Sequence, residues 1–171
     1  TFVALFFSKL IGLLLIIITV WVYYFFRDPE RFSIDDDSYL VSPADGLITD
    51  VSERSGPEEL RLENTSFTRV SIFMNVFNCH VNRVPTSCKI EEIYYKPGKF
   101  LNASLDKASE ENERNFFKIF SKKDNEEIII VQIAGLIARR IVCEVEQGQE
   151  LKQGDRIGMI RFGSRVDLYF K

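Results

Sequence analysis

A run of 17 uncharged residues near the amino terminus, from Leu10 to Phe26, constrains the fold more than any other stretch of the sequence. A helix of this length covers about 25 Å, close to the hydrocarbon thickness of a bilayer. The run has no polar face, which argues against a helix packed on a soluble domain. Aromatic residues and Arg27 stand where a signal peptide would carry small residues. We therefore predict a transmembrane helix over about residues 10–26, within a membrane anchor formed by residues 1–31.

The remaining sequence has the composition of one domain with a hydrophobic core. Of the 171 residues, 46% are hydrophobic and 13% are aromatic, which excludes a disordered chain. The net charge of -3 provides no bulk attraction to nucleic acid, so no nucleic-acid partner is expected. Three cysteines without paired spacing and a single histidine predict neither disulfides nor a metal site. The chain begins at Thr1 and stops at Lys171 inside an alternating apolar run, so we expect a fragment at both ends.

Short β-like runs, separated by turn residues, fill the sequence after Tyr39. They are rich in Ile, Val, Phe and Tyr, and Gly, Pro or Asn-Asp clusters divide them. The predicted strands are residues 47–51, 68–74, 89–95, 127–134, 139–145, 157–162 and 166–170. In the last of these, apolar residues alternate with Asp167 and Tyr169, the pattern of a half-buried strand. Because strands and helices do not alternate, a parallel α/β sheet is disfavoured.

The fold class predicted from this pattern is mainly β, with an antiparallel domain over residues 32–171. The glycine-punctuated stretch at 148–158 resembles the hairpins of barrel-sandwich folds such as lipoyl-type domains. One long irregular insertion, residues 97–115, is expected to form a loop with a short helix. The domain prediction is therefore a barrel-sandwich-like β domain that follows the amino-terminal helix.

Three side chains, Asp45, His80 and Ser164, are the parts of an acid, base and nucleophile set. Each has a simpler interpretation when taken alone. Asp45 lies in a Pro-Ala-Asp-Gly turn, His80 fits a strand, and Ser164 follows a glycine as many turn serines do. Their combination in one chain, together with the membrane anchor, favours the catalytic interpretation.

Five segments in a fixed order resemble the phosphatidylserine decarboxylase family, in its shorter bacterial branch. The segments are Phe26-Arg27-Asp28-Pro29-Glu30-Arg31, Ser42-Pro43-Ala44-Asp45-Gly46, Asn75-Val76-Phe77-Asn78-Cys79-His80-Val81-Asn82-Arg83-Val84-Pro85, Asn112-Glu113-Arg114-Asn115 and Phe162-Gly163-Ser164-Arg165. The resemblance runs from about residue 25 to residue 170. Each motif is weak alone, and the ordered set is specific.

The resemblance implies a proenzyme that cuts its own chain between Gly163 and Ser164. The Ser164 hydroxyl would attack the Gly163 carbonyl to form an ester, and β-elimination with loss of ammonia would leave a pyruvoyl group derived from Ser164. His80 would act as the base and Asp45 as the acid that orients or charges it. The two resulting chains would stay associated, and the small one would extend well past Lys171.

The mature reaction implied by the resemblance is decarboxylation of phosphatidylserine to phosphatidylethanolamine. The pyruvoyl carbonyl would form a Schiff base with the substrate amine and accept the electrons left by CO₂. His80 would then donate the proton that completes the product. The implied setting is the bacterial inner membrane, with the domain on the cytoplasmic face, and the resemblance leaves room for a homo-oligomer.

Two departures from the longer branch affect the site. Arg83 stands where that branch has a second histidine, and the processing motif reads Gly-Ser-Arg instead of Gly-Ser-Thr. Both fit the shorter branch and leave His80 to serve both reactions. Arg83 is then a candidate to bind a phosphate or carboxylate. Asn112 and Arg114 are further substrate-binding candidates from their motif.

Two other functions fit parts of the same pattern. A membrane-anchored barrel-sandwich adaptor or carrier would have no chain break and no role for His80, although the 148–158 hairpin lacks the flanking signature of a modified lysine. A membrane hydrolase with an Asp-His-Ser triad would use the same three residues but lacks a Gly-x-Ser-x-Gly elbow. Within the family, an ether-linked serine lipid is an alternative substrate.

Overall fold

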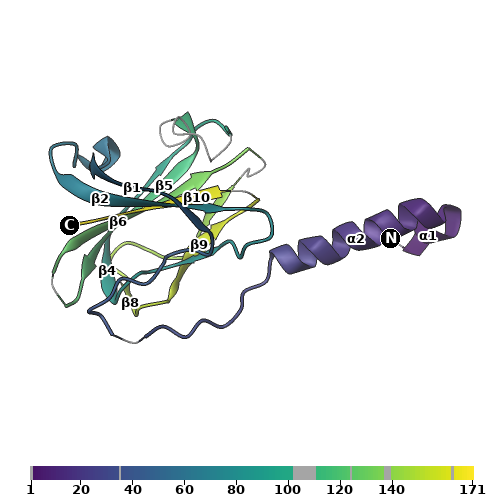
Figure 1. Cartoon of the computed structure of the whole chain (residues 1–171), viewed down its shortest axis with the longest axis horizontal. Helices are drawn as coiled ribbons and strands as arrows, with labels where there is room; N and C mark the ends of the chain where they lie inside the picture. The colour runs from purple at the N-terminus through teal and green to yellow at the C-terminus, as the bar shows by residue number, and fades with distance from the viewer. Residues whose placement is uncertain (1, 35, 102–110, 124, 137–139, 163) are drawn as a thin grey trace.

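The computed structural model describes residues 2–34, 36–101, 111–123, 125–136, 140–162 and 164–171. A helix projects from one end of a β-rich body, and the carboxyl terminus lies at the opposite end of that body (Figure 1). The predicted mainly β, antiparallel fold is confirmed.

The amino-terminal helical region consists of α1 (Phe2–Phe7) and α2 (Lys9–Phe25), with an extended residue, Ser8, between them. Most side chains of α2 are exposed, and Gly12 and Phe25 are buried. Within the described part of the chain, no helix has both the length and the apolar character needed to span a bilayer. The helix predicted at about residues 10–26 is present, but it has 17 residues and begins at a lysine, so its description as transmembrane is not supported.

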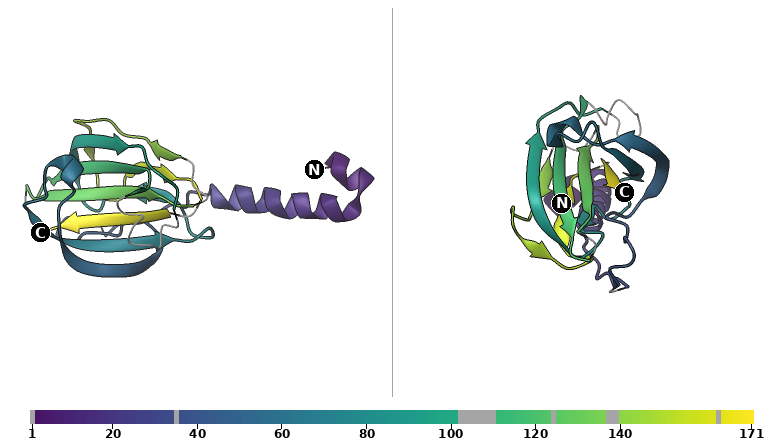
Figure 2. Two further views of the ribbon diagram at one scale, coloured as in Figure 1. Left: turned by 90° about the horizontal axis from the view of Figure 1, so that it is seen from above. Right: turned by 90° about the vertical axis from the view of Figure 1, so that its left-hand side faces the viewer.

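The strands form two antiparallel sheets within the described residues. The seven-stranded sheet contains, in spatial order, β1 (Leu47–Ser55), β2 (Ser66–Met74), β10 (Ser164–Phe170), β6 (Glu127–Ala134), β5 (Arg114–Ser121), β4 (Cys88–Lys96) and β8 (Glu150–Leu151). The three-stranded sheet contains β3 (Val81–Arg83), β9 (Arg156–Ile160) and β7 (Ile141–Cys143). Figure 2 shows the large sheet curving around one side of the body.

The main core lies between the two sheets. Alternate residues of the large sheet, such as Ile72, Ile130 and Val166, pack in one cluster with Ile157 and Ile160 of β9. The opposite face of the large sheet carries a second cluster, covered by the 3-10 turn η1 (Glu58–Leu60). β6 is therefore buried on both faces, which explains its nearly continuous apolar sequence.

Most predicted strands occur within a few residues of their predicted bounds. The prediction missed β3, β8 and β5, the last of which begins at Arg114 in a segment predicted as irregular. Much of the predicted insertion, residues 102–110, lies outside the described residues. The segment that positions the candidate nucleophile, β10, occupies the centre of the large sheet, between β2 and β6.

Candidate active site at the start of the central strand

Ser164 is the first residue of β10, and pairing on both sides fixes its position. It lies opposite Met74 of β2 and opposite Ala134 of β6. Its side chain shares a face with Val166, so it points toward the core between the sheets. The Ser164 Oγ atom is buried and has no hydrogen-bond partner among the described residues. A buried hydroxyl without a partner is costly, and such a group calls for a functional explanation.

His80 precedes β3 and is fully buried. Its Nδ1 atom lies 3.0 Å from the Asn78 carbonyl oxygen, which can only accept a hydrogen bond, so Nδ1 carries the proton of the neutral ring. The His80 carbonyl accepts a hydrogen bond from the Ile160 amide at 3.3 Å. Burial lowers the pKa of His80 to about 4, with a contribution from the charge of Arg27, against the opposing effect of the Asn78 bond. The ring is therefore neutral at pH 7, with its lone pair on Nε2.

An aromatic cluster joins His80 to the chain just before Ser164. The ring centroids of Phe25 and His80 are 4.4 Å apart, and Phe25 stacks at the same distance on Phe162. Trp21 stacks on the ring of Phe162 at 5.7 Å. The end of α2 thus brings the candidate base and the predicted cleavage segment together, although Gly163 itself lies outside the described residues.

Phe162 has a backbone conformation that bulky residues rarely adopt. Its φ is 59°, in the left-handed region, where a side chain costs roughly 1 kcal/mol or more. The aromatic contacts of its ring offset this strain. A strained residue therefore lies one position before Gly163, whose bond to Ser164 the sequence predicts to be cut.

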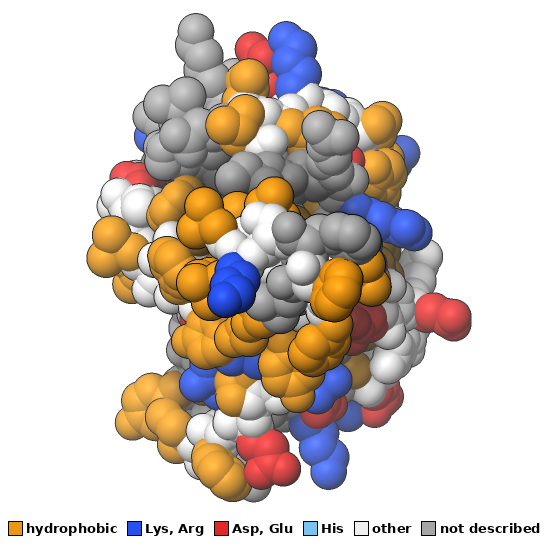
Figure 3. Space-filling model, turned by 90° about the vertical axis from the view of Figure 1, so that its right-hand side faces the viewer, with side chains coloured by type: hydrophobic (Ala, Val, Ile, Leu, Met, Phe, Trp, Pro, Cys, Tyr) orange, Lys and Arg blue, Asp and Glu red, His pale blue; other side chains and the backbone are white. Residues whose placement is uncertain are grey.

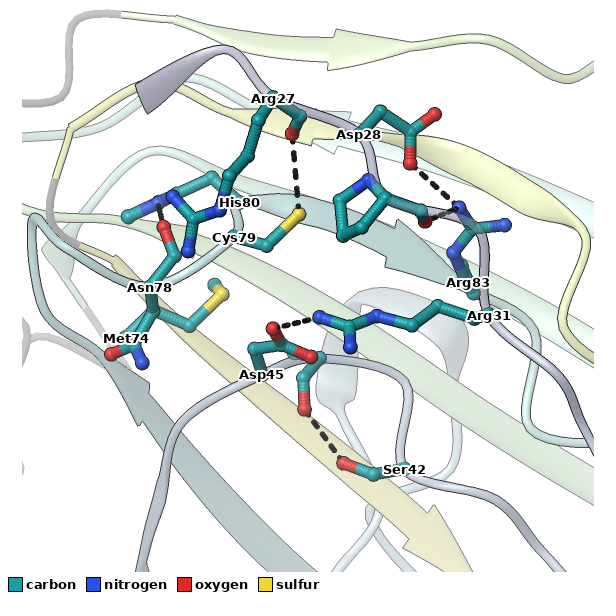
Figure 4. Close-up of polar contacts among 12 residues, drawn as sticks. Arg27, Asp28, Arg31, Ser42, Asp45, Met74, Asn78, Cys79, His80 and Arg83 are labelled. Carbon is teal, nitrogen blue, oxygen red and sulfur yellow. Dashed lines mark hydrogen bonds and ion pairs between the residues drawn. The ribbon is translucent and has the colours of Figure 1, made fainter. Parts of the chain in front are cut away.

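The ion-pair partner that the structure gives Asp45 is Arg31. Figure 4 draws this contact of the Asp45 carboxylate, with no line from Asp45 to His80. The turn that carries it is closed by Ser42, whose Oγ donates to the Ala44 carbonyl at 2.7 Å. The predicted orienting role of Asp45 toward His80 therefore stays a prediction.

A cavity of about 170 Å³ lies beside Asp45, beneath the segment that follows α2. Cys79, Val81 and Arg83 line it from the β3 side, whereas His80 does not. Arg83 donates to Asp28 at 2.6 Å and to the Gly154 carbonyl at 2.8 Å. In this structure Arg83 anchors the segment after α2, so binding of a substrate phosphate or carboxylate by Arg83 would compete with Asp28.

Asn112 is buried close to the Ser164 end of the large sheet. Its Nδ2 donates to the carbonyls of Ala134 at 2.7 Å and Leu101 at 2.8 Å, and its Oδ1 accepts from the Leu101 amide at 2.9 Å. Because Ala134 pairs with Ser164, Asn112 supports the backbone beside the nucleophile. A direct substrate contact by Asn112 stays a prediction.

Arg114 lies on the other face of the large sheet. It shares a row with Ile133 and Arg165, and its Nη2 donates to Glu59 Oε1 at 2.8 Å. It lines a cavity of about 660 Å³ beneath η1. The structure therefore separates Arg114 from the face that carries Ser164.

Buried amides beneath the site were not identified from the sequence. Asn82 Oδ1 accepts from Gln132 Nε2 at 2.8 Å, and Asn82 Nδ2 lies 3.7 Å from the Met74 sulfur. Asn115 extends this network to Gln132 at 3.4 Å. The available signal was the position of Asn82 two residues after His80, which places both on one face of an extended segment.

The surroundings of Ser164 fit its conversion to a pyruvoyl group. The hydroxyl is buried and unpartnered among the described residues, and the apolar residues around it would exclude water from an electrophilic carbonyl at this position. The three cysteines are free thiols: Cys79 and Cys88 are buried, and Cys143 is exposed. No group of three or more His, Cys, Asp or Glu side chains that could hold a metal occurs in the described ranges.

Comparison with known proteins places nearly the whole sequence beside one family. The family model described as phosphatidylserine decarboxylase matches residues 18–171. A phosphatidylserine decarboxylase proenzyme of Pelagibacter ubique is 66% identical over 164 residues, which cover 96% of this chain and 76% of that protein. The proenzymes of Rickettsia akari and Ruegeria pomeroyi are 53% and 54% identical, over 95% and 89% of this chain and 70% and 69% of theirs. Neither the adaptor nor the hydrolase interpretation receives support from these relatives.

Proposed function

The chain belongs to the phosphatidylserine decarboxylase family, and we propose that it converts phosphatidylserine to phosphatidylethanolamine and CO₂ after cutting its own backbone between Gly163 and Ser164. The observation that carries this proposal is the buried Ser164 Oγ, which has no hydrogen-bond partner among the described residues. Two residues before it, the Phe162 ring packs on Phe25, which also packs on the neutral ring of His80. A hydroxyl in this setting has a nucleophilic role available and no structural one among the described contacts.

Self-cleavage begins with the transfer of the Ser164 hydroxyl proton to Nε2 of His80. Nδ1 is already committed to the Asn78 carbonyl, so the ring presents its lone pair from the other nitrogen. Ser164 Oγ then bonds to the Gly163 carbonyl carbon, and the Gly163–Ser164 C–N bond breaks, which gives an ester and a free amine. The strained φ of Phe162 holds the preceding chain in a conformation that cleavage can relax.

β-Elimination completes the cut. When the α-proton of Ser164 is removed, the Cβ–Oγ bond of Ser164 breaks. The oxygen leaves with the Gly163 acyl group, so the first chain ends in a Gly163 carboxylate. The dehydro residue left behind tautomerises to an imine, and water replaces its nitrogen as ammonia to leave a ketone. His80 is the base available for the α-proton.

In the mature enzyme, the pyruvoyl group derived from Ser164 supplies an electron sink for the loss of CO₂ from the substrate serine. The chain contributes by excluding water from this position, since Ser164 and His80 are both fully buried. His80, once protonated, is the donor that returns a proton to the carbon from which CO₂ has left. The burial that lowers its pKa makes the protonated ring a better proton donor than an ordinary imidazolium.

The finer assignments follow from this function as proposals. Residues 32–171 form the decarboxylase domain as a barrel sandwich, and residues 1–31 form the part that associates with the membrane. The two cleaved chains stay together because β10 pairs with β2 and β6, and the complex can assemble further as a homo-oligomer. The enzyme works at the inner membrane with its domain on the cytoplasmic face, consistent with free cysteines and a lipid substrate.

Mass spectrometry of the natural full-length protein tests the proposal. A cut protein should give a large chain that ends at Gly163 and a small chain. The small chain should be lighter than the same chain with an amino-terminal serine, by the mass difference between serine and a pyruvoyl group. The purified protein should also release CO₂ from phosphatidylserine. An uncut protein with an ordinary Ser164 that still decarboxylated this lipid would overturn the mechanism.

A further inference from the structure

We propose that residues 75–78 form a lipid-contacting turn that places the Phe77 side chain in the interface of an anionic bilayer, next to His80. We refer to this segment as the 75–78 turn. The inference rests on the proposed function, because a lipid substrate must reach His80 from a bilayer, and it adds the surface through which the β domain meets that bilayer.

The exposure of Phe77 is imposed by the structure of the turn. The Asn78 amide donates to the Asn75 carbonyl at 3.0 Å, and the Asn75 amide donates to Asn78 Oδ1 at 2.9 Å. The Phe77 amide donates to Asn75 Oδ1 at 2.8 Å. With these three bonds closing the turn, the Phe77 side chain is 62% exposed. A large aromatic side chain that a hydrogen-bonded turn holds in an exposed position is suited to contact an apolar surface outside the protein, such as a bilayer.

Arg27 ties the 75–78 turn to the end of α2. Its Nη2 donates to the Phe77 carbonyl at 2.9 Å, and its guanidinium carbon lies 3.8 Å from the centre of the Tyr24 ring. Tyr23, Tyr24 and Phe26 at this end of the helix are also exposed. Phe77 therefore continues an aromatic surface that begins on an apolar helix, and aromatic rings of this kind favour the level of lipid headgroups.

Leu136 and two more arginines lie on the same end of the molecule. Leu136 follows the end of β6, where Ala134 pairs with Ser164, and is 67% exposed. Arg140 and Arg161 are exposed and adjacent, since the Arg161 amide donates to the Arg140 carbonyl. Figure 3, seen from the side on which the helices project, shows hydrophobic side chains gathered in the middle of this face, with Lys and Arg and also Asp and Glu side chains around them. Apolar groups mixed with cations complement an anionic bilayer better than they complement a purely apolar protein surface.

The 75–78 turn also connects this surface to the base. The Asn78 carbonyl, within the turn, accepts the hydrogen bond from His80 Nδ1. Figure 4 shows Arg27, Asn78 and His80 together. A lipid headgroup at the depth of the bilayer that Phe77 reaches would therefore lie close to the segment that holds His80.

Site-specific fluorescent labelling tests the contact independently of catalysis. Full-length Ser164→Ala protein that also carries Cys143→Ser is reconstituted into vesicles of phosphatidylcholine and phosphatidylglycerol, without phosphatidylserine. Phe77→Cys or the control Val51→Cys is then labelled, because Val51 is similarly exposed, at 61%, but lies on β1. Nitroxide-bearing lipids should quench the label at position 77 several-fold more than the label at 51, and aqueous iodide should show the reverse preference.

Two results would overturn the inference. A label at 77 quenched by iodide and not by lipid would place the turn in water. A label shielded from both quenchers would indicate a protein partner, such as a second copy of the chain. Because these vesicles hold no substrate and the protein cannot cut itself, either result is independent of whether the wild-type protein decarboxylates phosphatidylserine.

A kinetic comparison adds a second readout. Phe77→Ser should raise KM for phosphatidylserine in bilayers by about tenfold. This is the order expected when the variant loses the free energy of burying part of an aromatic ring in the bilayer. The same variant should leave kcat and KM for a short-chain, monomeric phosphatidylserine close to wild type. Equal losses on both substrates would show that the turn acts on His80 through structure alone, and would contradict the lipid contact.

Discussion

The ring of Phe25, the last residue of α2, packs against the ring of His80 with centroids 4.4 Å apart and planes inclined by 38°. A residue of the apolar amino-terminal helix therefore covers the candidate base of a β domain. Both side chains are fully buried. The helix is thus part of the site, in addition to any role at a membrane.

Removal of the Phe25 ring should raise the pKa of His80. Burial is the main cause of its low value, about 4, so Phe25→Ala should admit water and move the pKa toward 6.5. NMR titration of the single histidine in the Ser164→Ala protein measures this directly. Phe32→Ala, at an exposed ring, is the matched control. An unchanged pKa in Phe25→Ala would mean that other groups desolvate His80.

The stability of the uncut protein should fall between pH 6.5 and about 4. In this range the unfolded chain protonates His80 and the folded chain does not, so protons favour unfolding. The loss attributable to His80 is at most about 3 kcal/mol, and it is absent above pH 6.5. Urea unfolding of Ser164→Ala with and without His80→Gln should isolate it as the difference between the two pH profiles. Parallel profiles would contradict the low pKa.

Ser164→Ala and His80→Ala should each leave the natural full-length protein in one piece on a denaturing gel. The first removes the nucleophile, and the second removes the base that takes its proton. Cys143→Ser, at an exposed thiol, should cut normally. A His80→Ala protein that cut at the wild-type rate would assign the base to another residue.

Asp167→Asn should destabilise the uncut protein by roughly 3 kcal/mol, because it leaves the buried Arg165 guanidinium without its carboxylate. The two side chains form paired contacts at 2.6 and 2.7 Å, with 4% and 1% of their side-chain surfaces exposed. Glu150→Gln, in the exposed pair with Lys122, should have a much smaller effect. Chemical denaturation of Ser164→Ala variants measures both. Similar small losses would show that water reaches Arg165.

Gly158→Ala should destabilise β9 by about 3 kcal/mol or more, since φ there is 151° and a Cβ would overlap the Val142 carbonyl oxygen. Gly148→Ala is the control, because its φ is 87° but the space around it is open, and it should cost only about 1 kcal/mol. Thermal unfolding of the two variants should therefore differ. Equal losses would mean that backbone conformation, and not the overlap, sets the cost at Gly158.

The sequence predicted the β class and most strands because alternating apolar residues and turn residues act locally. It missed β5, whose polar start at Arg114 is buried by an ion pair with Glu59, distant in sequence. It also described the last strand as half-buried, whereas Asp167 and Tyr169 are buried. Alternation of apolar and polar residues along a strand indicates that one face of the sheet is buried. It cannot indicate that a second segment, here η1, covers the other face as well.

The candidate site was predictable in its residue types and only partly in its arrangement. Motif order identified Ser164 and His80, and the structure joins His80, through Phe25, to Phe162, two residues before Ser164. The ion pair of Asp45 with Arg31 and the separation of Arg114 from Ser164 depend on which chain segments meet, information that no local pattern holds. Phe25 was predicted as part of a membrane anchor, and its contact with His80 was not foreseen.

The ladder pairs on both edges of β10 also bear on what would follow the proposed cut. The piece that begins at residue 164 could leave only by opening the middle of the seven-stranded sheet. Exchange of this piece between molecules should therefore be far slower than turnover. Isotope-labelled and unlabelled cut enzymes, mixed under native conditions, would keep their original partners, so each enzyme would use one copy of its prosthetic group throughout its life.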